Sequence, residues 1–150
     1  MNQKLLIIGG SGLVGSTLAK YAEKDYDIFL TYNKNKLTNS SYKQFQVDLL
    51  ENRKKIIDLI QSIKPHYVVN TVAHSSVDLC EENHQIANEL HVDVTKDIAE
   101  ICNKINSKLI YFSTDAVFDG KINSDKLDVI ARMSGADYSL TREKVQLSRS

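Results

Sequence analysis

The sequence predicts a single α/β domain built on a doubly wound parallel sheet with helices on both faces. Short apolar runs, rich in β-branched and aromatic residues, are typical of strands buried on both faces. They alternate along the chain with segments of helical periodicity, which favours right-handed β-α-β units and a parallel sheet. The length of 150 residues is close to that of one domain and is sufficient for a buried core.

Five strands are expected. Four are apolar runs, and they are Lys4–Ile8, Asp27–Thr31, Tyr67–Asn70 and Lys108–Ser113. The fifth, Ser41–Val47, has the weakest pattern and leads into Asp48.

Three helical segments are expected between these strands. The first begins after Gly12, and the second runs from Asn52 to Lys64, where Pro65 ends it. The third carries an apolar stripe with steps of three or four residues, and its members are Ile86, Leu90, Val94, Ile98, Ile101 and Ile105. We interpret such stripes as core packing. No periodic element is predicted from Asp119 to Asp137, a length that suits an active-site loop.

Composition excludes several classes of function. Lys and Arg number 19, as do Asp and Glu, and this zero net charge argues against nucleic acid as a partner. No apolar run approaches the ~20 residues that would cross a membrane, and no signal peptide is recognisable. Cys80 and Cys102 have neither a disulfide framework nor metal-ligand spacing, so we expect a cytoplasmic protein with reduced cysteines and no metal site.

A glycine-rich turn follows the first strand. Gly9, Gly12 and Gly15 give the spacing G-x-x-G-x-x-G, which permits a tight turn and brings backbone N–H groups close to a pyrophosphate. The helix start adds unpaired N–H donors and the positive end of its dipole. We therefore predict a dinucleotide site, the alternative being a plain strand-to-helix turn. Its residues all follow strands and are Gly9, Ser11, Gly12, Leu13, Val14, Gly15, Asn33, Lys34, Asp48, Leu49, Asn70, Thr71, Val72 and Ala73.

The choice between NADP(H) and NAD(H) depends on the segment after the second strand. Many NAD sites have an acidic residue about 20 positions after the glycine turn, but residues 32–36 read YNKNK. Lys34 or Lys36 would neutralise a 2′-phosphate, which favours NADP(H); alternatively, both are solvated loop lysines. Asp48 is placed to accept a hydrogen bond from an adenine amino group, or else to cap the following helix.

Four segments resemble the extended short-chain dehydrogenase/reductases, and most of all their dTDP-4-dehydrorhamnose reductase branch. They are the Gly9–Gly15 turn, PHYVVNTVAH at 65–74, VDLCE at 77–81 and STDAVFDG at 113–120, of which the last is the most specific. The resemblance covers the chain from Lys4 to about Gly120 and extends more faintly to Lys144. It implies a Rossmann-like fold that binds NADP(H) or NAD(H), and hydride transfer to the 4-keto group of a nucleotide-linked 6-deoxy sugar.

The resemblance also implies three catalytic residues. Thr114 matches the family's Ser/Thr, which positions the carbonyl, and Tyr138 matches the tyrosine that gives a proton to the developing alkoxide. Arg142 stands where the family has a lysine, and this exchange keeps the charge but changes its geometry. A second register places Lys126 at the lysine and Ile122 at the tyrosine, which would remove the acid.

Two hypotheses follow. The first is an NAD(P)(H)-dependent reductase of a nucleotide sugar, lacking the family's C-terminal substrate subdomain. The second is a non-catalytic module like the beta regulatory subunit of methionine adenosyltransferase, favoured by Arg142, by Ala116 in place of an aromatic residue, and by the length. We expect little turnover from the chain alone, because the binding site would lack the second wall that holds a sugar nucleotide near the nicotinamide. An unpaired sheet edge after the fifth strand would favour a homo-oligomer.

Overall fold

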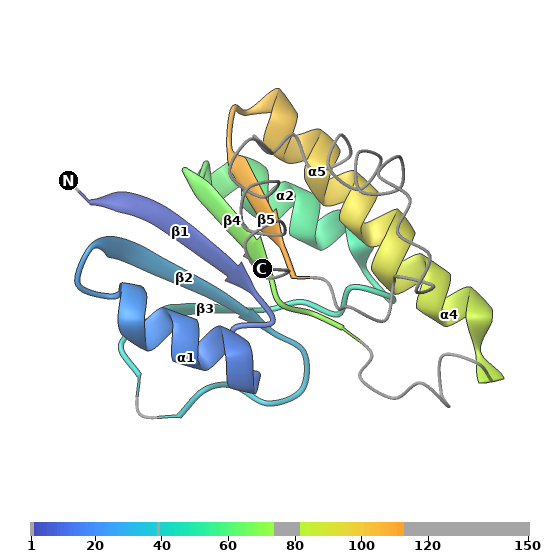
Figure 1. The fold of residues 1–150 in the computed structure, drawn as a ribbon, viewed down its shortest axis with the longest axis horizontal. Helices are drawn as coiled ribbons and strands as arrows, with labels where there is room; N and C mark the ends of the chain where they lie inside the picture. The colour runs from blue at the N-terminus through green and yellow to red at the C-terminus, as the bar shows by residue number, and fades with distance from the viewer. Residues whose placement is uncertain (1, 39, 74–81, 113–150) are drawn as a thin grey trace, which may run out of the picture. The chain divides into compact units, whose positions relative to one another are not determined.

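The computed structural model describes residues 2–38, 40–73 and 82–112, which lie within one compact unit ending at Phe112. These residues contain a five-stranded sheet in the order β3-β2-β1-β4-β5, and every neighbouring pair is parallel. The strands are β1 (Gln3–Ile8), β2 (Tyr26–Tyr32), β3 (Lys43–Gln46), β4 (Tyr67–Asn70) and β5 (Lys108–Tyr111). The predicted doubly wound sheet is confirmed (Figure 1).

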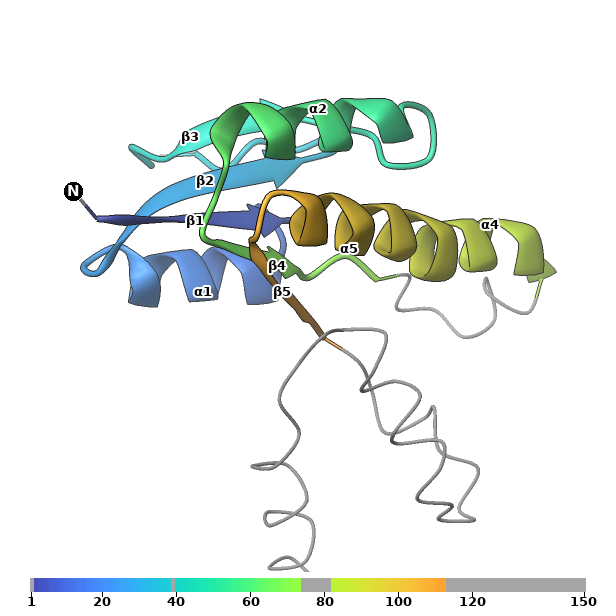
Figure 2. The same ribbon diagram turned by 90° about the horizontal axis from the view of Figure 1, so that it is seen from above.

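The helices occupy the predicted segments. They are α1 (Leu13–Ala22), α2 (Arg53–Ile63), α4 (His84–Asn88), the π-helical segment η1 (Glu89–Asp93) and α5 (Val94–Lys104). The last three follow one another without a break and form one long helix (Figure 2). No helix among the described residues is long and apolar enough to cross a membrane.

Helix α2 shows how local sequence sets an element's bounds. The Asn52 side chain accepts a hydrogen bond from the Lys55 N–H at 3.2 Å, which satisfies a donor at the helix start. At the other end Lys64 adopts a left-handed conformation, with φ of 48°, immediately before Pro65. The helix therefore ends where the proline predicts.

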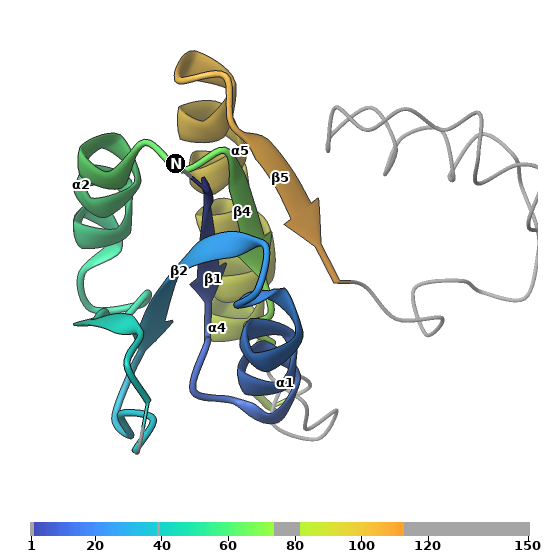
Figure 3. The same ribbon diagram turned by 90° about the vertical axis from the view of Figure 1, so that its left-hand side faces the viewer.

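The two faces of the sheet carry separate cores. Helix α1 packs Ala19 over Leu5, Ile7 and Leu30, whereas α2 and α5 together cover the opposite face. Figure 3 shows α1 and α2 on opposite sides of the strands. The larger core, under α2 and α5, includes Ile56 and Ile98, both fully buried.

Two sequence expectations need correction. Ile86, the first member of the predicted core stripe, is 41% exposed, because it lies on the short α4 segment, where none of the residues is buried. Strand β3 is shorter than the predicted Ser41–Val47; Phe45 is the one apolar residue among its four, and all four are partly or fully exposed. The expectation that residues 1–150 make one domain stays a prediction for the part beyond Phe112.

Candidate dinucleotide-binding site

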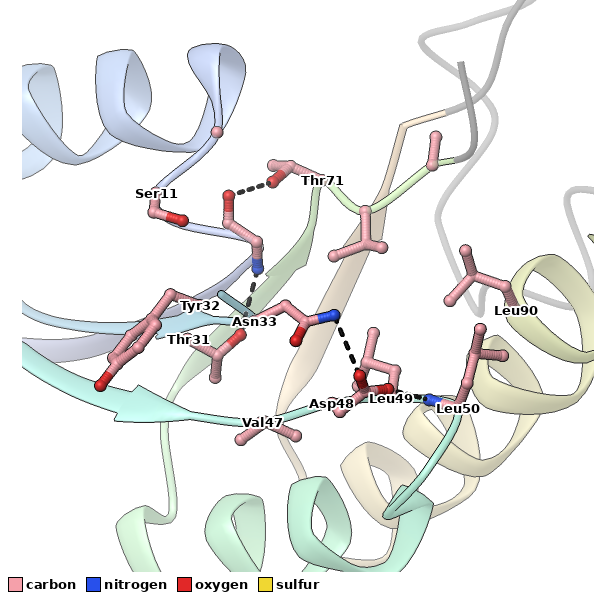
Figure 4. Close-up of a pocket in the computed structure, with 14 residues that line it drawn as sticks. Ser11, Thr31, Tyr32, Asn33, Val47, Asp48, Leu49, Leu50, Thr71 and Leu90 are labelled. Carbon is pink, nitrogen blue, oxygen red and sulfur yellow. Dashed lines mark hydrogen bonds between the residues drawn. The ribbon is translucent and has the colours of Figure 1, made fainter. Parts of the chain in front are cut away.

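A pocket of about 370 Å³ opens where the strands end. The glycine turn, the ends of β2 and β4, the segment after β3 and one residue of the long helix contribute to its lining (Figure 4). The lining residues are Gly9, Ser11, Gly12, Thr31, Tyr32, Asn33, Val47, Asp48, Leu49, Leu50, Thr71, Val72, Ala73 and Leu90. The pocket lies at the switch point of the sheet, between β1 and β4, where open α/β sheets bind ligands.

The glycine turn requires its glycines for different reasons. Gly9 has a φ of 78°, a conformation that side chains disfavour, and a Cβ there would lie 2.7 Å from Val72 Cγ2. A Cβ on Gly15 would lie 2.5 Å from the Gly9 carbonyl oxygen, so this glycine permits close packing of the helix on the turn. Gly12 has more space around it, since the Gly9 carbonyl oxygen lies 3.3 Å from its Cβ position. The absence of a side chain at Gly12 therefore matters for a ligand in the pocket rather than for packing within the protein.

Hydrogen bonds to neighbouring strands fix the turn. The Gly9 N–H donates to Thr31 Oγ1 at 3.1 Å, and the Gly10 N–H donates to the Thr31 carbonyl at 2.8 Å. Immediately after β4, the Thr71 hydroxyl donates to the Ile8 carbonyl at 2.8 Å. The turn is thus held between β2 and β4 with its conformation set in advance (Figure 4).

The start of α1 offers donors to an anion. Its N-cap is Gly12, and no side chain of the described residues caps it. The N–H groups of the first helical turn have no acceptor within the helix, since the first helical bond runs from the Ser16 N–H to the Gly12 carbonyl. These free donors and the helix dipole suit a pyrophosphate at this position.

The end of β2 carries no carboxylate. Thr31, Tyr32 and Asn33 line the pocket there, and Thr31 is buried, with its hydroxyl engaged by the turn. Lys34 is exposed, and its charge is one of the influences that lower the pKa of Asp48. The segment that ends β2 therefore contributes a nearby cation and no acid, and the carboxylate beside Asn33 is that of Asp48, which follows β3.

Asp48 is held by three hydrogen bonds. Its Oδ1 accepts from the N–H groups of Leu50 and Glu51, at 2.9 and 3.1 Å, and its Oδ2 accepts from Asn33 Nδ2 at 3.1 Å. The bond from the Glu51 N–H is the largest cause of a lowered pKa for this carboxyl. The side chain caps a turn rather than α2 itself, whose N-cap is Asn52. Asp48 lines the pocket (Figure 4), and its contact with adenine stays a prediction.

The structure gathers nine of the predicted cofactor residues around this pocket, and they are Gly9, Ser11, Gly12, Asn33, Asp48, Leu49, Thr71, Val72 and Ala73. Five others do not line it: Leu13, Val14, Gly15, Lys34 and Asn70. Leu13 and Val14 are exposed at the helix start. Buried Asn70 supports the pocket lining indirectly, because its side chain accepts a hydrogen bond from the Val72 N–H at 3.1 Å.

Sequence reasoning missed five lining residues: Thr31, Tyr32, Val47, Leu50 and Leu90. Thr31 ends a predicted strand, and Tyr32 begins the 32–36 segment to which the rule that ligands bind beyond strand ends pointed, but neither was assigned to the site. Leu90 was assigned to the core stripe, and it does belong to the core, but it also reaches the pocket. The predicted catalytic residues Thr114, Tyr138 and Arg142, with Ile122 and Lys126 of the second register, lie outside the described residues.

These features define the class: a Rossmann-like α/β domain with the glycine turn and switch-point pocket of dinucleotide-binding proteins. The chain belongs to the RmlD substrate binding domain family, whose model matches residues 3–133. The family expected from the glycine turn and the STDAVFDG segment is confirmed.

Relatives of two kinds are found. A dTDP-4-dehydrorhamnose reductase of Aggregatibacter actinomycetemcomitans is 31% identical over 121 residues, covering 78% of this chain and 36% of the relative. The methionine adenosyltransferase 2 subunit beta of Bos taurus is 29% identical, covering 79% of this chain and 34% of the relative. The chain thus spans about a third of the length of these relatives.

Solved structures agree with the fold. A hypothetical dTDP-4-dehydrorhamnose reductase from Sulfolobus tokodaii superposes with a TM-score of 0.71 at 26% identity, covering 79% of this chain and 42% of that one. The Bacillus anthracis dTDP-4-dehydrorhamnose reductase, solved in complex with NADP, gives a TM-score of 0.65 at 25% identity, covering 81% and 40%.

Proposed function

We propose that this chain is the dinucleotide-binding part of an NAD(P)(H)-dependent reductase of a nucleotide-linked 4-keto-6-deoxy sugar. The observation that carries the proposal is the uncapped start of α1, behind a glycine turn whose conformation is fixed by Thr31 and Thr71. The family and the NADP bound to the Bacillus anthracis relative support the choice of ligand.

The pocket residues divide by chemistry. The N–H groups after Gly12 would hold the pyrophosphate, and the open side of Gly12 would admit it closely. Asp48, between the apolar side chains of Val47 and Leu49, would face the adenosine end. Val72 and Ala73, at the end of β4, would line the path of the dinucleotide beyond the pyrophosphate.

The bound dinucleotide would supply the hydride, while this chain's residues position the reactants and move a proton. By family resemblance, Thr114 would orient the substrate carbonyl and Tyr138 would give a proton to the developing alkoxide. Arg142 would supply a positive charge that lowers the pKa of that tyrosine.

The absence of an acid at the end of β2, among the described residues, favours NADP(H) over NAD(H). An acidic residue there would accept hydrogen bonds from the ribose 2′-hydroxyl but would repel a 2′-phosphate. Exposed Lys34 and Lys36 would neutralise that phosphate.

Fluorescence titration of the 150-residue chain with NADPH tests the proposal. A valine at Gly12 would obstruct the pyrophosphate, so Gly12→Val should weaken binding by at least about tenfold, or about 1.4 kcal/mol. Thr17→Val is the matched control, because Thr17 is exposed on α1 and outside the pocket lining. Equal affinity of Gly12→Val and the unaltered chain would refute the site.

A second candidate is a non-catalytic regulatory module, favoured by the similarity to the beta subunit of methionine adenosyltransferase 2. Both functions would use the same pocket, so dinucleotide binding does not distinguish them. Oxidation of NADPH followed at 340 nm with a dTDP-4-keto-6-deoxy sugar, in the natural full-length gene product, does so. Turnover abolished by Tyr138→Phe supports the reductase, and tight binding without turnover supports the module.

A further inference from the structure

One segment of the long helix differs from the rest. Residues Glu89–Asp93 form a π-helical turn between α4 and α5, and such turns are uncommon insertions that often occur at functional sites. The first buried residue of this helix, Leu90, lies in the turn and projects to the pocket wall (Figure 4). The turn thus forms part of the site.

Two other elements hold the π-turn. His91 Nδ1 lies 3.3 Å from the Tyr111 hydroxyl, which links the turn to β5. Arg53, the first residue of α2, forms an ion pair from Nε to Asp97 at 2.7 Å and approaches Asp93 at 3.9 Å. The ion pair is largely at the surface and so contributes little energy, whereas the His91–Tyr111 contact is partly buried.

Tyr111 connects this link to a second wall of the pocket. It pairs with Asn70 across β4 and β5, and the Phe112 N–H donates to the Asn70 carbonyl at 3.4 Å. The Asn70 side chain in turn accepts from the N–H of Val72, which lines the pocket. His91 and Tyr111 therefore join the segment of Leu90 to the segment of Val72, and both of these residues line the pocket.

We propose that His91 and Tyr111 are positioning residues for the dinucleotide site, because their contact fixes the position of Leu90 relative to Val72, and both of these residues line the pocket. Neither His91 nor Tyr111 lines the pocket, so they act through the residues that do. The inference rests on the proposed dinucleotide binding and adds to it the residues that tune affinity. A link with only a structural role would change the free energy of unfolding and leave the affinity of the folded protein unaltered.

A double-mutant cycle on the 150-residue chain tests this. Tyr111→Phe removes the hydroxyl and keeps the ring, His91→Ala removes the imidazole, and His91→Asn keeps an amide near the position of Nδ1. NADPH affinity is measured by fluorescence titration, and urea unfolding is followed by circular dichroism, so that binding and stability are separated. Tyr42→Phe is the matched control, since it removes a tyrosine hydroxyl bonded to Glu23 at 2.5 Å, outside the dinucleotide pocket.

Tyr111→Phe and His91→Ala should each weaken binding by about three- to tenfold, the size of one hydrogen bond. The double variant should lose less than the sum of the two single changes, His91→Asn should regain most of the affinity, and Tyr42→Phe should bind normally. Unchanged affinity in Tyr111→Phe, or fully additive losses in the cycle, would overturn the inference while leaving the proposed function intact. Failure of the unaltered chain to bind NADPH would overturn both.

Discussion

The two ends of the sheet use their polar groups differently. At the amino end these groups pair with one another: Lys4 Nζ donates to the Ile63 carbonyl at 2.8 Å, and the Lys4 N–H donates to His66 Nδ1 at 3.0 Å. The Ser107 hydroxyl donates to the Pro65 carbonyl in the same region. These bonds tie the end of α2 and the start of β5 to β1, so this end contributes stability.

At the carboxyl end the polar groups are held in place, but among the described residues some of them have no hydrogen-bond partner. Thr31 and Thr71 anchor the glycine turn, yet the first N–H groups of α1 have no side-chain cap. Donors held in place without a protein partner are available to a ligand at no further cost in ordering. We therefore expect changes at the carboxyl end of the sheet to alter dinucleotide binding and changes at the amino end to alter stability.

The largest effect is expected at high pH, from Cys102 near the amino end. This thiol is buried at the end of α5, and burial raises its pKa from 9.0 to about 12. The folded chain therefore keeps a proton that the unfolded chain releases, and stability falls as the pH rises from 9 to about 12. The slope from this group reaches about 1.4 kcal/mol per pH unit.

Urea unfolding followed by circular dichroism between pH 8 and about 11 measures that slope. Cys102→Ala should lower stability at neutral pH and give a shallower decline above pH 9. Partly buried Tyr111 also has a raised pKa, chiefly through desolvation, and would add to the decline above pH 10 in both proteins. Identical slopes for the two proteins would contradict the assignment to Cys102.

The next effect concerns Lys4. Its ammonium group bonds the last carbonyl of α2, where a cation also complements the helix dipole. Lys4→Met keeps most of the stem and removes the charge, so it should cost about 1–2 kcal/mol of unfolding free energy. NADPH affinity should not change. Lys54→Met, on the exposed surface of α2, is the control; weaker NADPH binding in Lys4→Met alone would break the separation of the two ends.

The fold was more predictable than the site. Strands β1, β2, β4 and β5 are short apolar runs between helices, and their alternation with helices predicted the parallel sheet. The order of the strands was not predicted. Strand β3 lies at the sheet edge with polar residues, so its pattern was weak. The local glycine pattern located the turn.

The remaining parts of the site depend on contacts that spacing does not encode. Leu90 and Val94 are four residues apart, as in an ordinary helix, so nothing in the stripe reveals the π-turn. The Asn33 bond to Asp48 joins residues after different strands, and the sequence pointed to Asp48 without showing that its oxygens are engaged. Such contacts follow from tertiary packing rather than from periodicity.

The smallest effect concerns cofactor choice at the carboxyl end. If Lys34 and Lys36 meet a 2′-phosphate, removing both charges should weaken NADPH binding by about tenfold and leave NADH binding nearly unaltered. Both side chains are exposed, so neither change should affect stability. The effect should shrink as salt rises, because surface charges are screened.

Titration calorimetry of Lys34→Met/Lys36→Met with both cofactors, at low and high salt, measures this. Lys54→Met/Lys55→Met removes two exposed lysines from α2 and controls for net charge. Equal losses for NADPH and NADH would show that the lysines do not read the phosphate, and the preference would then have to come from Tyr32 and Asn33, which line the pocket.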